Sequence, residues 1–133
     1  QPESSAASDV YKRQFSGKVV YGNQLGRTIG IPTANLWMPK QRLPVQGVFA
    51  VKCKLVDKHL YGIANMGTRP TVDGESPVLE VHLFDFDQNI YGQRLEIEFI
   101  KKIRDERKFD NINLLKQQIH KDIDIAKDTL KLI

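Results

Sequence analysis

The sequence predicts a mainly β protein, in which short antiparallel strands form a closed or nearly closed barrel and one helix follows them. Strand-like segments recur between residues 48 and 100, and most of them alternate apolar and polar residues with a period of two. Short turn sequences separate these segments. Beyond residue 110 the apolar residues recur every three or four positions, which is typical of an amphipathic helix. We expect this helix to cover one end of the barrel.

The N-terminal residues differ in character from the rest of the chain. Residues 1–14 are rich in serine and alanine and lack apolar periodicity, so we expect a disordered segment or residues foreign to the domain. The folded domain is predicted to span residues 15–133. Its first short strand is Gly17–Tyr21, and a long loop is expected from Gly22 to Pro44.

The remaining strands are read from alternation and from turn residues. They are predicted at Val48–Val56, Leu60–Met66, Val78–Phe86 and Arg94–Ile100. Cys53 alternates with apolar residues of its strand, which predicts a buried and unreactive thiol. Glu80 and His82 lie on the face of their strand that is opposite to its leucines and valines.

Two connecting segments carry distinctive residues. Gly67–Thr71 contains glycine and proline, so we expect it to end a strand in a sharp turn. The segment Lys101–Phe109, taken alone, is predicted to be a solvated basic loop or an RNA contact. The helix that follows has Asp110 or Asn111 as its candidate N-cap. Its apolar stripe consists of Ile112, Leu115, Ile119, Ile123, Ala126 and Leu130.

The composition is that of one folded domain. The chain has 133 residues, of which 41% are hydrophobic, and this suffices for a single core. No apolar run approaches the roughly 20 residues of a membrane helix, and no signal peptide is recognisable. The single cysteine, together with these observations, favours a cytoplasmic protein. The net charge of +4 suits nucleic acid, but it suits a small anionic substrate such as a nucleotide equally well.

The most informative stretch is the glycine-rich part of the long loop. Gly22, Gly26 and Gly30 allow backbone N–H groups to approach an anion, and Arg27 adds a positive charge. The loop is not a Walker loop, because no Gly-Lys-Ser/Thr follows the glycines. It is not a dinucleotide fingerprint either, because no helix is expected to begin after it. On spacing alone, a flexible surface loop explains the glycines equally well.

Thr33 and Asn35 follow this loop and lie two residues apart, on one side of an extended backbone. Their hydroxyl and amide oxygens suit a Mg²⁺ ion that is held mainly by water and substrate phosphates.

The string from Gly17 through Gly22, Gly26, Arg27 and Gly30 to Pro32-Thr33-Ala34-Asn35 resembles the signature of the riboflavin kinase family. It is most similar to the C-terminal kinase module of bacterial bifunctional riboflavin kinase/FMN adenylyltransferases. The resemblance continues to the end of the chain through the following segments: Gly47–Ala50, Ala64–Thr71, Leu79–His82, Tyr91–Gly92 and Lys102–Phe109. It implies a riboflavin kinase-like closed antiparallel barrel of Greek-key type with a C-terminal helix.

The resemblance also implies a role for each matching residue. The glycine loop, with Gly22, Gly26, Arg27 and Gly30, would close over the phosphates of ATP. Thr33 and Asn35 would hold Mg²⁺ as well as the nucleotide, and Glu80 would be the catalytic base. In the family the corresponding loop closes on the flavin, so Arg104 and Phe109 are candidates for flavin binding, through contact with the isoalloxazine ring or with phosphate.

The residues alone leave some of these roles open. Without the resemblance, a solvated strand carboxylate is the favoured interpretation of Glu80, although its place on the face opposite the core suits a base. For His82 we favour a structural or supporting role over a catalytic one. The position of Trp37 gives no basis for choosing between packing under the loop and lying near adenine.

The expected activity is transfer of the γ-phosphate of ATP to the 5′-hydroxyl of riboflavin, which gives FMN and ADP. The expected partners are therefore ATP and riboflavin, with neither nucleic acid nor membrane. Adenylylation of FMN is not expected from this chain, although an upstream FMN adenylyltransferase domain can precede it in a longer protein. A basic nucleic-acid-binding barrel is the alternative, but most aromatic residues lie in apolar strands rather than among the lysines. A flavin-binding module without catalysis would need neither the Thr33 and Asn35 pair nor Glu80.

Overall fold

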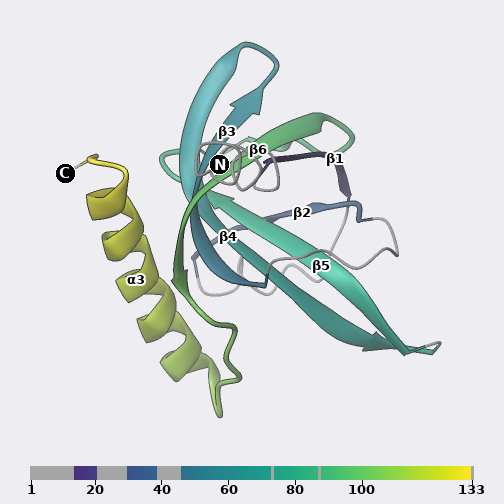
Figure 1. Cartoon of the computed structure of the whole chain (residues 1–133), viewed down its shortest axis with the longest axis vertical. Coiled ribbons are helices and arrows are strands. Elements are labelled where there is room, and N and C mark those ends of the chain that lie inside the picture. The colour runs from purple at the N-terminus through teal and green to yellow at the C-terminus, as the bar shows by residue number, and fades with distance from the viewer. Residues whose placement is uncertain (1–13, 21–29, 39–45, 73, 87, 133) are drawn as a thin grey trace, which may run out of the picture.

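A computed structural model of the chain describes residues 14–20, 30–38, 46–72, 74–86 and 88–132. Within these residues the strands form a closed antiparallel barrel in the order β1-β2-β5-β4-β3-β6, and a helix lies beside it (Figure 1). The elements are β1 (Gln14–Val20), β2 (Ala34–Leu36), β3 (Gly47–Leu55), β4 (Lys58–Thr71), β5 (Gly74–Leu83), β6 (Arg94–Arg104) and α3 (Ile112–Thr129). β3, β4 and β5 are consecutive neighbours and β6 returns beside β3, which is the Greek-key order. The predicted fold class is confirmed.

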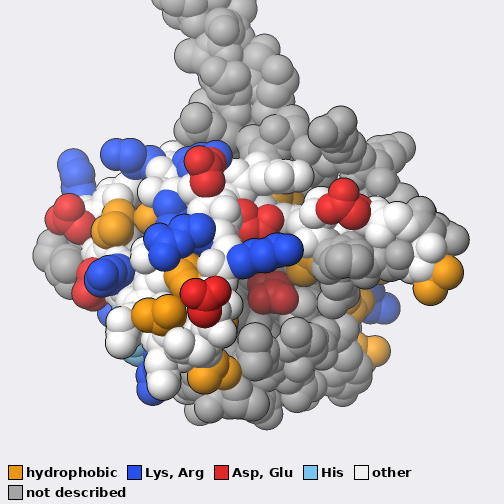
Figure 2. All heavy atoms as spheres, turned by 90° about the horizontal axis from the view of Figure 1, so that it is seen from below, with side chains coloured by type: hydrophobic (Ala, Val, Ile, Leu, Met, Phe, Trp, Pro, Cys, Tyr) orange, Lys and Arg blue, Asp and Glu red, His pale blue; other side chains and the backbone are white. Residues whose placement is uncertain are grey.

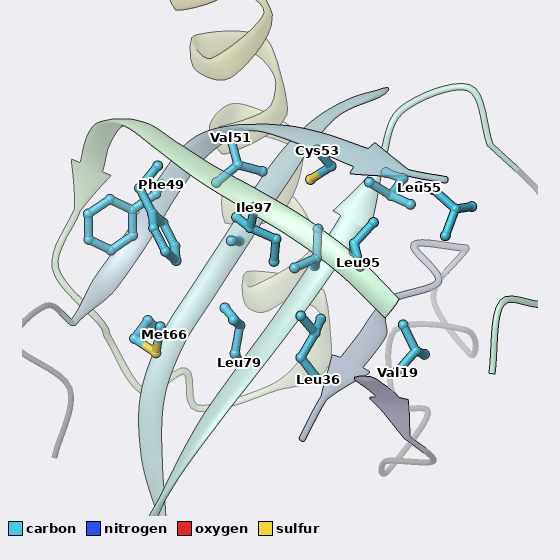
Figure 3. Close-up of a cluster of buried hydrophobic side chains, with 14 of the residues drawn as sticks. Val19, Leu36, Phe49, Val51, Cys53, Leu55, Met66, Leu79, Leu95 and Ile97 are labelled. Atoms are coloured by element: carbon cyan, nitrogen blue, oxygen red, sulfur yellow. The ribbon is translucent and has the colours of Figure 1, made fainter. Parts of the chain in front are cut away.

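The core fills the inside of the barrel. Alternate residues of every strand point inward, and the buried cluster includes Val51 and Leu79, both with 0% exposure (Figure 3). Phe49 and Phe99 meet edge to face with ring centroids 5.1 Å apart. The lysines of β3 alternate with these residues and are exposed. The period-two alternation in the sequence therefore predicts the inward face of β3 correctly.

The strand β2 lies inside the segment that the sequence analysis expects to be a loop. Ala34–Leu36 pairs with β1 on one side and with β5 on the other, and it closes the barrel between them. Three residues are too few to show a period, so their strand conformation depends on the two neighbouring strands.

Two other boundaries also differ from expectation. β4 does not end at Gly67 but stays paired with β5 as far as Thr71 opposite Gly74, so the expected sharp turn is wrong. β6 extends to Arg104, so only the second half of the expected basic loop is irregular. In both places a strand that is already paired continues through residues of low intrinsic β-propensity.

The helix α3 lies against the side of the barrel, not over its end (Figure 1). Its residues Ile119, Ile123 and Ala126 pack on Ala50 of β3 and Ile63 of β4, which point outward from the barrel. Asn111 is the N-cap, and its side-chain oxygen accepts a hydrogen bond of 2.9 Å from the backbone N–H of Leu114. A second, smaller hydrophobic core therefore lies between the helix and the outer surface of the barrel.

An ion pair fastens the end of β6 to α3. Asp122 is 1% exposed and accepts hydrogen bonds from Arg104 Nε, at 3.0 and 3.1 Å, and from Arg104 Nη2, at 2.9 Å. Gln118 donates a further bond of 3.0 Å to the same carboxylate. Such a buried bidentate pair fixes the position of both elements.

No helix among the described residues is long and apolar enough to cross a membrane. β1 begins at Gln14, the last residue of the segment that we expect to lie outside the domain. Residues 1–13 lie outside the described part of the chain.

Cys53 points into the barrel, as predicted, and burial raises the pKa of its thiol to about 12. Because the thiolate is the reactive form, a disulfide-exchange reagent at pH 8 should modify Cys53 only after the protein unfolds. The measurement is the absorbance of the coloured thiol that the reagent releases when it reacts with Cys53, with and without denaturant. Rapid modification of the native protein would contradict this buried placement.

Candidate active site

The candidate site lies on the outer surface of the barrel, where three polar residues stand in one row across neighbouring strands. Asn35 of β2 pairs with Glu80 of β5, and Glu80 pairs in turn with Asn65 of β4. Directly opposed residues share a face, with Cβ atoms about 4.5–5.5 Å apart. The residues on either side of Asn35, Glu80 and Asn65 belong to the core, so these three side chains point away from it.

Asn35 is the unusual member of this row, because its side chain is buried although it lies on the outer surface. It is 7% exposed, and its Oδ1 atom has no hydrogen-bond partner among the described residues. A buried acceptor without a partner costs about 1–3 kcal/mol. An amide oxygen kept at such a cost fits a cation ligand, so the residues present suit the Mg²⁺ ion expected from the sequence.

Thr33 precedes β2 and is half-buried. It lies two residues before Asn35, so in extended backbone the two side chains project on the same side. Gly30 is exposed and has a φ of +77°, a conformation that disfavours residues with a side chain. Gly22, Gly26 and Arg27, the other predicted members of the phosphate-binding loop, lie outside the described residues.

His82 joins the strand of Glu80 to the segment of Thr33. Its Nδ1 atom lies 2.8 Å from the carbonyl oxygen of Pro32, which only accepts, so Nδ1 is the protonated ring nitrogen. Burial lowers the pKa of His82, the hydrogen bond to Pro32 raises it, and the proximity of Lys127 and His120 lowers it further. The imidazole is therefore neutral at pH 7, with Nδ1–H as its donor.

Arg104 and Phe109, the predicted flavin contacts, lie together near α3. The guanidinium of Arg104 lies 5.6 Å from the centre of the Phe109 ring, and that of Arg107 lies 4.9 Å from the same centre. Asp122 already holds Arg104, whose side chain is 18% exposed. Arg104 pairs with Val48 of β3, and Val48 pairs with Asn65 of β4. Because Asn65 pairs with Glu80, Arg104 lies in the same row as Glu80, three strands away. Their contact with a flavin stays a prediction.

Sequence reasoning missed two features of this surface. The first is Asn65, which belongs to the motif segment Ala64–Thr71 and faces Glu80 directly. A carboxylate of the irregular segment after β6, Glu106, lies so close to Gly67 that a Cβ atom there would overlap it. Burial raises the pKa of Glu106, and the charge of Arg104 opposes that rise. A glycine on the outward side of a paired strand was the available signal for such a close approach.

The comparison with protein families decides the assignment. The riboflavin kinase family model, Flavokinase, matches residues 10–130. The chain belongs to the riboflavin kinase family. A bifunctional riboflavin kinase/FMN adenylyltransferase of Haemophilus influenzae is 55% identical over 112 residues, which are 84% of this chain and 36% of that protein. This member of the riboflavin kinase family thus spans about a third of the length of the curated relatives it matches.

Solved structures give the same fold. A riboflavin kinase from Trypanosoma brucei matches with a TM-score of 0.63 at 21% identity, covering 89% of this chain and 79% of that one. A structure named as a macrolide-efflux protein from Streptococcus pneumoniae matches with a TM-score of 0.79 at 37% identity. It covers 86% of this chain but only 38% of the pneumococcal chain. The family assignment supports the kinase interpretation and gives no support to a nucleic-acid-binding barrel. The trypanosomal structure supports the fold.

Proposed function

We propose that this riboflavin kinase domain transfers the γ-phosphate of ATP to the 5′-hydroxyl of riboflavin, with Glu80 as base and Thr33 and Asn35 as the metal-binding pair. The observation that carries this proposal is the pairing of Asn35 with Glu80 on adjacent strands of the outer surface. It sets a candidate metal ligand beside a candidate base, which is what phosphoryl transfer to an alcohol requires.

Glu80 would accept the proton of the 5′-hydroxyl as that oxygen forms its bond to the γ-phosphorus. The bond between the γ-phosphorus and the oxygen that bridges to the β-phosphate breaks, and ADP leaves with the electron pair. The β5 strand is paired on both sides at Glu80, so the carboxylate stands on a fixed backbone. A fixed base and in-line geometry account for much of the rate in such reactions.

Thr33 Oγ1 and Asn35 Oδ1 are the atoms that would hold Mg²⁺, which offsets negative charge on the transferred phosphoryl group. The Oδ1 atom of Asn35 is buried and accepts no hydrogen bond from the part of the chain that the structure describes, which supports this role. Gly22, Gly26, Arg27 and Gly30 would surround the phosphates with N–H donors and a positive charge.

The flavin is proposed to extend from Glu80 along the outer surface toward Arg104 and Phe109, where an aromatic ring and a guanidinium lie together. In the relatives this module is part of a longer protein, and we propose that an upstream FMN adenylyltransferase domain accompanies it in a cytoplasmic enzyme. The riboflavin kinase family model matches residues 10–130, and it supports kinase activity and not efflux for this chain. Figure 2 shows basic and acidic side chains mixed on one face of the described part of the molecule.

Incubation of the protein with riboflavin, ATP and Mg²⁺ tests the proposal, with the flavins separated by chromatography. FMN and ADP should form in equal amounts. FAD should not appear unless an adenylyltransferase domain is present. Absence of FMN with folded protein and all three reactants would contradict the proposed activity.

Replacement of Asn35 by Ala should raise the Mg²⁺ concentration needed for half-maximal activity by at least about 10-fold, because even supporting residues of metal sites change affinity by 10- to 100-fold. The measurement is a Mg²⁺ titration at saturating ATP. Asn65→Ala is the matched control, since Asn65 is the same residue on the other side of Glu80 and is exposed. An equal shift in both variants would remove Asn35 as the metal ligand.

A further inference from the structure

The segment that carries Thr33 is attached to β5 in two different ways. From Ala34 onward, backbone pairing with β5 fixes the chain, with Ala34 opposite Val81. Before that residue the ladder has ended, and His82 takes over through its bond of 2.8 Å to the carbonyl oxygen of Pro32. Thr33 therefore lies between a side-chain bond on one side and a backbone ladder on the other.

His82 is itself held in place from the outside. Its ring meets Phe84 edge to face, with centroids 5.9 Å apart, and Lys127 of α3 lies 5.4 Å from the centre of the Phe84 ring. The charged or titratable groups facing His82 from the helix are Lys127 and His120. A ring restrained in this way holds its hydrogen bond in one orientation.

We propose that His82 is a positioning residue: by holding the Pro32 carbonyl on β5, it sets the Thr33 hydroxyl at a fixed distance from the Glu80 carboxylate. Glu80 and His82 are two residues apart on β5 and project on the same face. One strand thus carries both the base and the side chain that locates the metal-binding segment. The inference rests on the proposed kinase function and adds to it a residue that touches neither substrate nor metal.

Two variants separate this role from simple packing. In His82→Asn the amide nitrogen takes the place of Nδ1, so the donor to Pro32 is kept, whereas in His82→Gln it takes the place of Nε2 and the donor is displaced. Both variants lose the aromatic ring and its contact with Phe84. A difference between them therefore reports the hydrogen bond and not the ring.

The probe is Mg²⁺ with ADP, and binding is followed by calorimetry and by the fluorescence of Trp37, the single tryptophan, which follows β2 directly. We expect His82→Gln to weaken Mg·ADP binding about 10- to 100-fold, as loss of a supporting bond at a metal site does. His82→Asn should bind far more nearly like the wild type. The KM for riboflavin should change in neither variant, because the hydrogen bond between His82 and Pro32 positions Thr33, which is proposed to bind the metal and the nucleotide and not the flavin. Equal binding by the two variants would overturn the inference and leave the proposed function standing.

A second measurement does not depend on the folding of any variant. The ¹⁵N chemical shifts of the His82 ring in the wild-type protein distinguish the two neutral tautomers. We expect protonation at Nδ1, with and without Mg·ADP, whereas protonation at Nε2 would overturn the inference. Failure of the wild type to bind Mg·ADP or to form FMN would instead remove the proposed function and the inference together.

Discussion

Glu80→Gln should reduce the rate of FMN formation by about 10²- to 10⁴-fold, the usual contribution of a positioned general base. Gln has nearly the same size as Glu and keeps an oxygen toward the substrate, but it cannot accept the proton of the 5′-hydroxyl. We therefore expect kcat to fall while the binding of Mg·ADP stays close to that of the wild type. The measurement is steady-state FMN production combined with calorimetric binding of Mg·ADP.

Glu96→Gln is the control for Glu80→Gln. Glu96 is also a strand carboxylate that points outward, but it lies on β6 and is exposed. The control should leave kcat unchanged. If Glu80→Gln retained full activity, Glu80 would not be the base, and Glu106 would be the next carboxylate to test on this side of the barrel.

Asp122→Ala should lower the free energy of unfolding by about 3–5 kcal/mol, because it leaves the Arg104 guanidinium largely buried without its partner. Urea denaturation gives this value directly. Asp124→Ala is the matched control, since it removes the same charge from an exposed position of the same helix. Such a surface change should stay within about 0.5 kcal/mol.

A double variant tests the cause of the loss at Asp122. Arg104→Met combined with Asp122→Leu removes both charges and keeps apolar volume, so it should be more stable than Asp122→Ala alone. If the double variant were the less stable of the two, packing of the helix and not the unpaired charge would explain the loss. The double variant also tests the predicted flavin contact of Arg104, because it removes the guanidinium from a protein that remains folded. Loss of that contact should raise the KM for riboflavin.

The sequence was a good guide wherever a pattern repeats within one element. The alternation around Cys53 predicts the inward face of β3. The apolar spacing after Asn111 predicts the helix, and Asn111, one of the two candidate caps, is its N-cap. These features depend on the local period of the chain and on its end groups. Partners distant in sequence are not encoded locally. The three residues of β2 become a strand only because β1 and β5 lie on both sides of them.

The candidate site follows the same division. Thr33, Asn35 and Glu80 are recognised from a motif, but their proximity follows only from the pairing of β2 with β5. The hydrogen bond between His82 and Pro32 joins residues 50 positions apart, and no local sequence pattern predicts it. The burial of Asp122 does have a local sequence pattern, because Asp122 lies three residues after Ile119 and four before Ala126, on the apolar side of the helix. A carboxylate at such a position is buried only when it has a partner.

The short ladder between β2 and β5 has a consequence for how errors in folding affect this protein. Side chains alternate along a strand, so a slip of one residue in β2 would turn the amide of Asn35 into the barrel and move Ala34 and Leu36 to its outer face. The interior has no partner for that amide, and two apolar residues would be lost from the core. A chain with the wrong alignment would therefore be unstable before it was inactive, and every molecule that closes its barrel correctly also assembles the pair formed by Asn35 and Glu80.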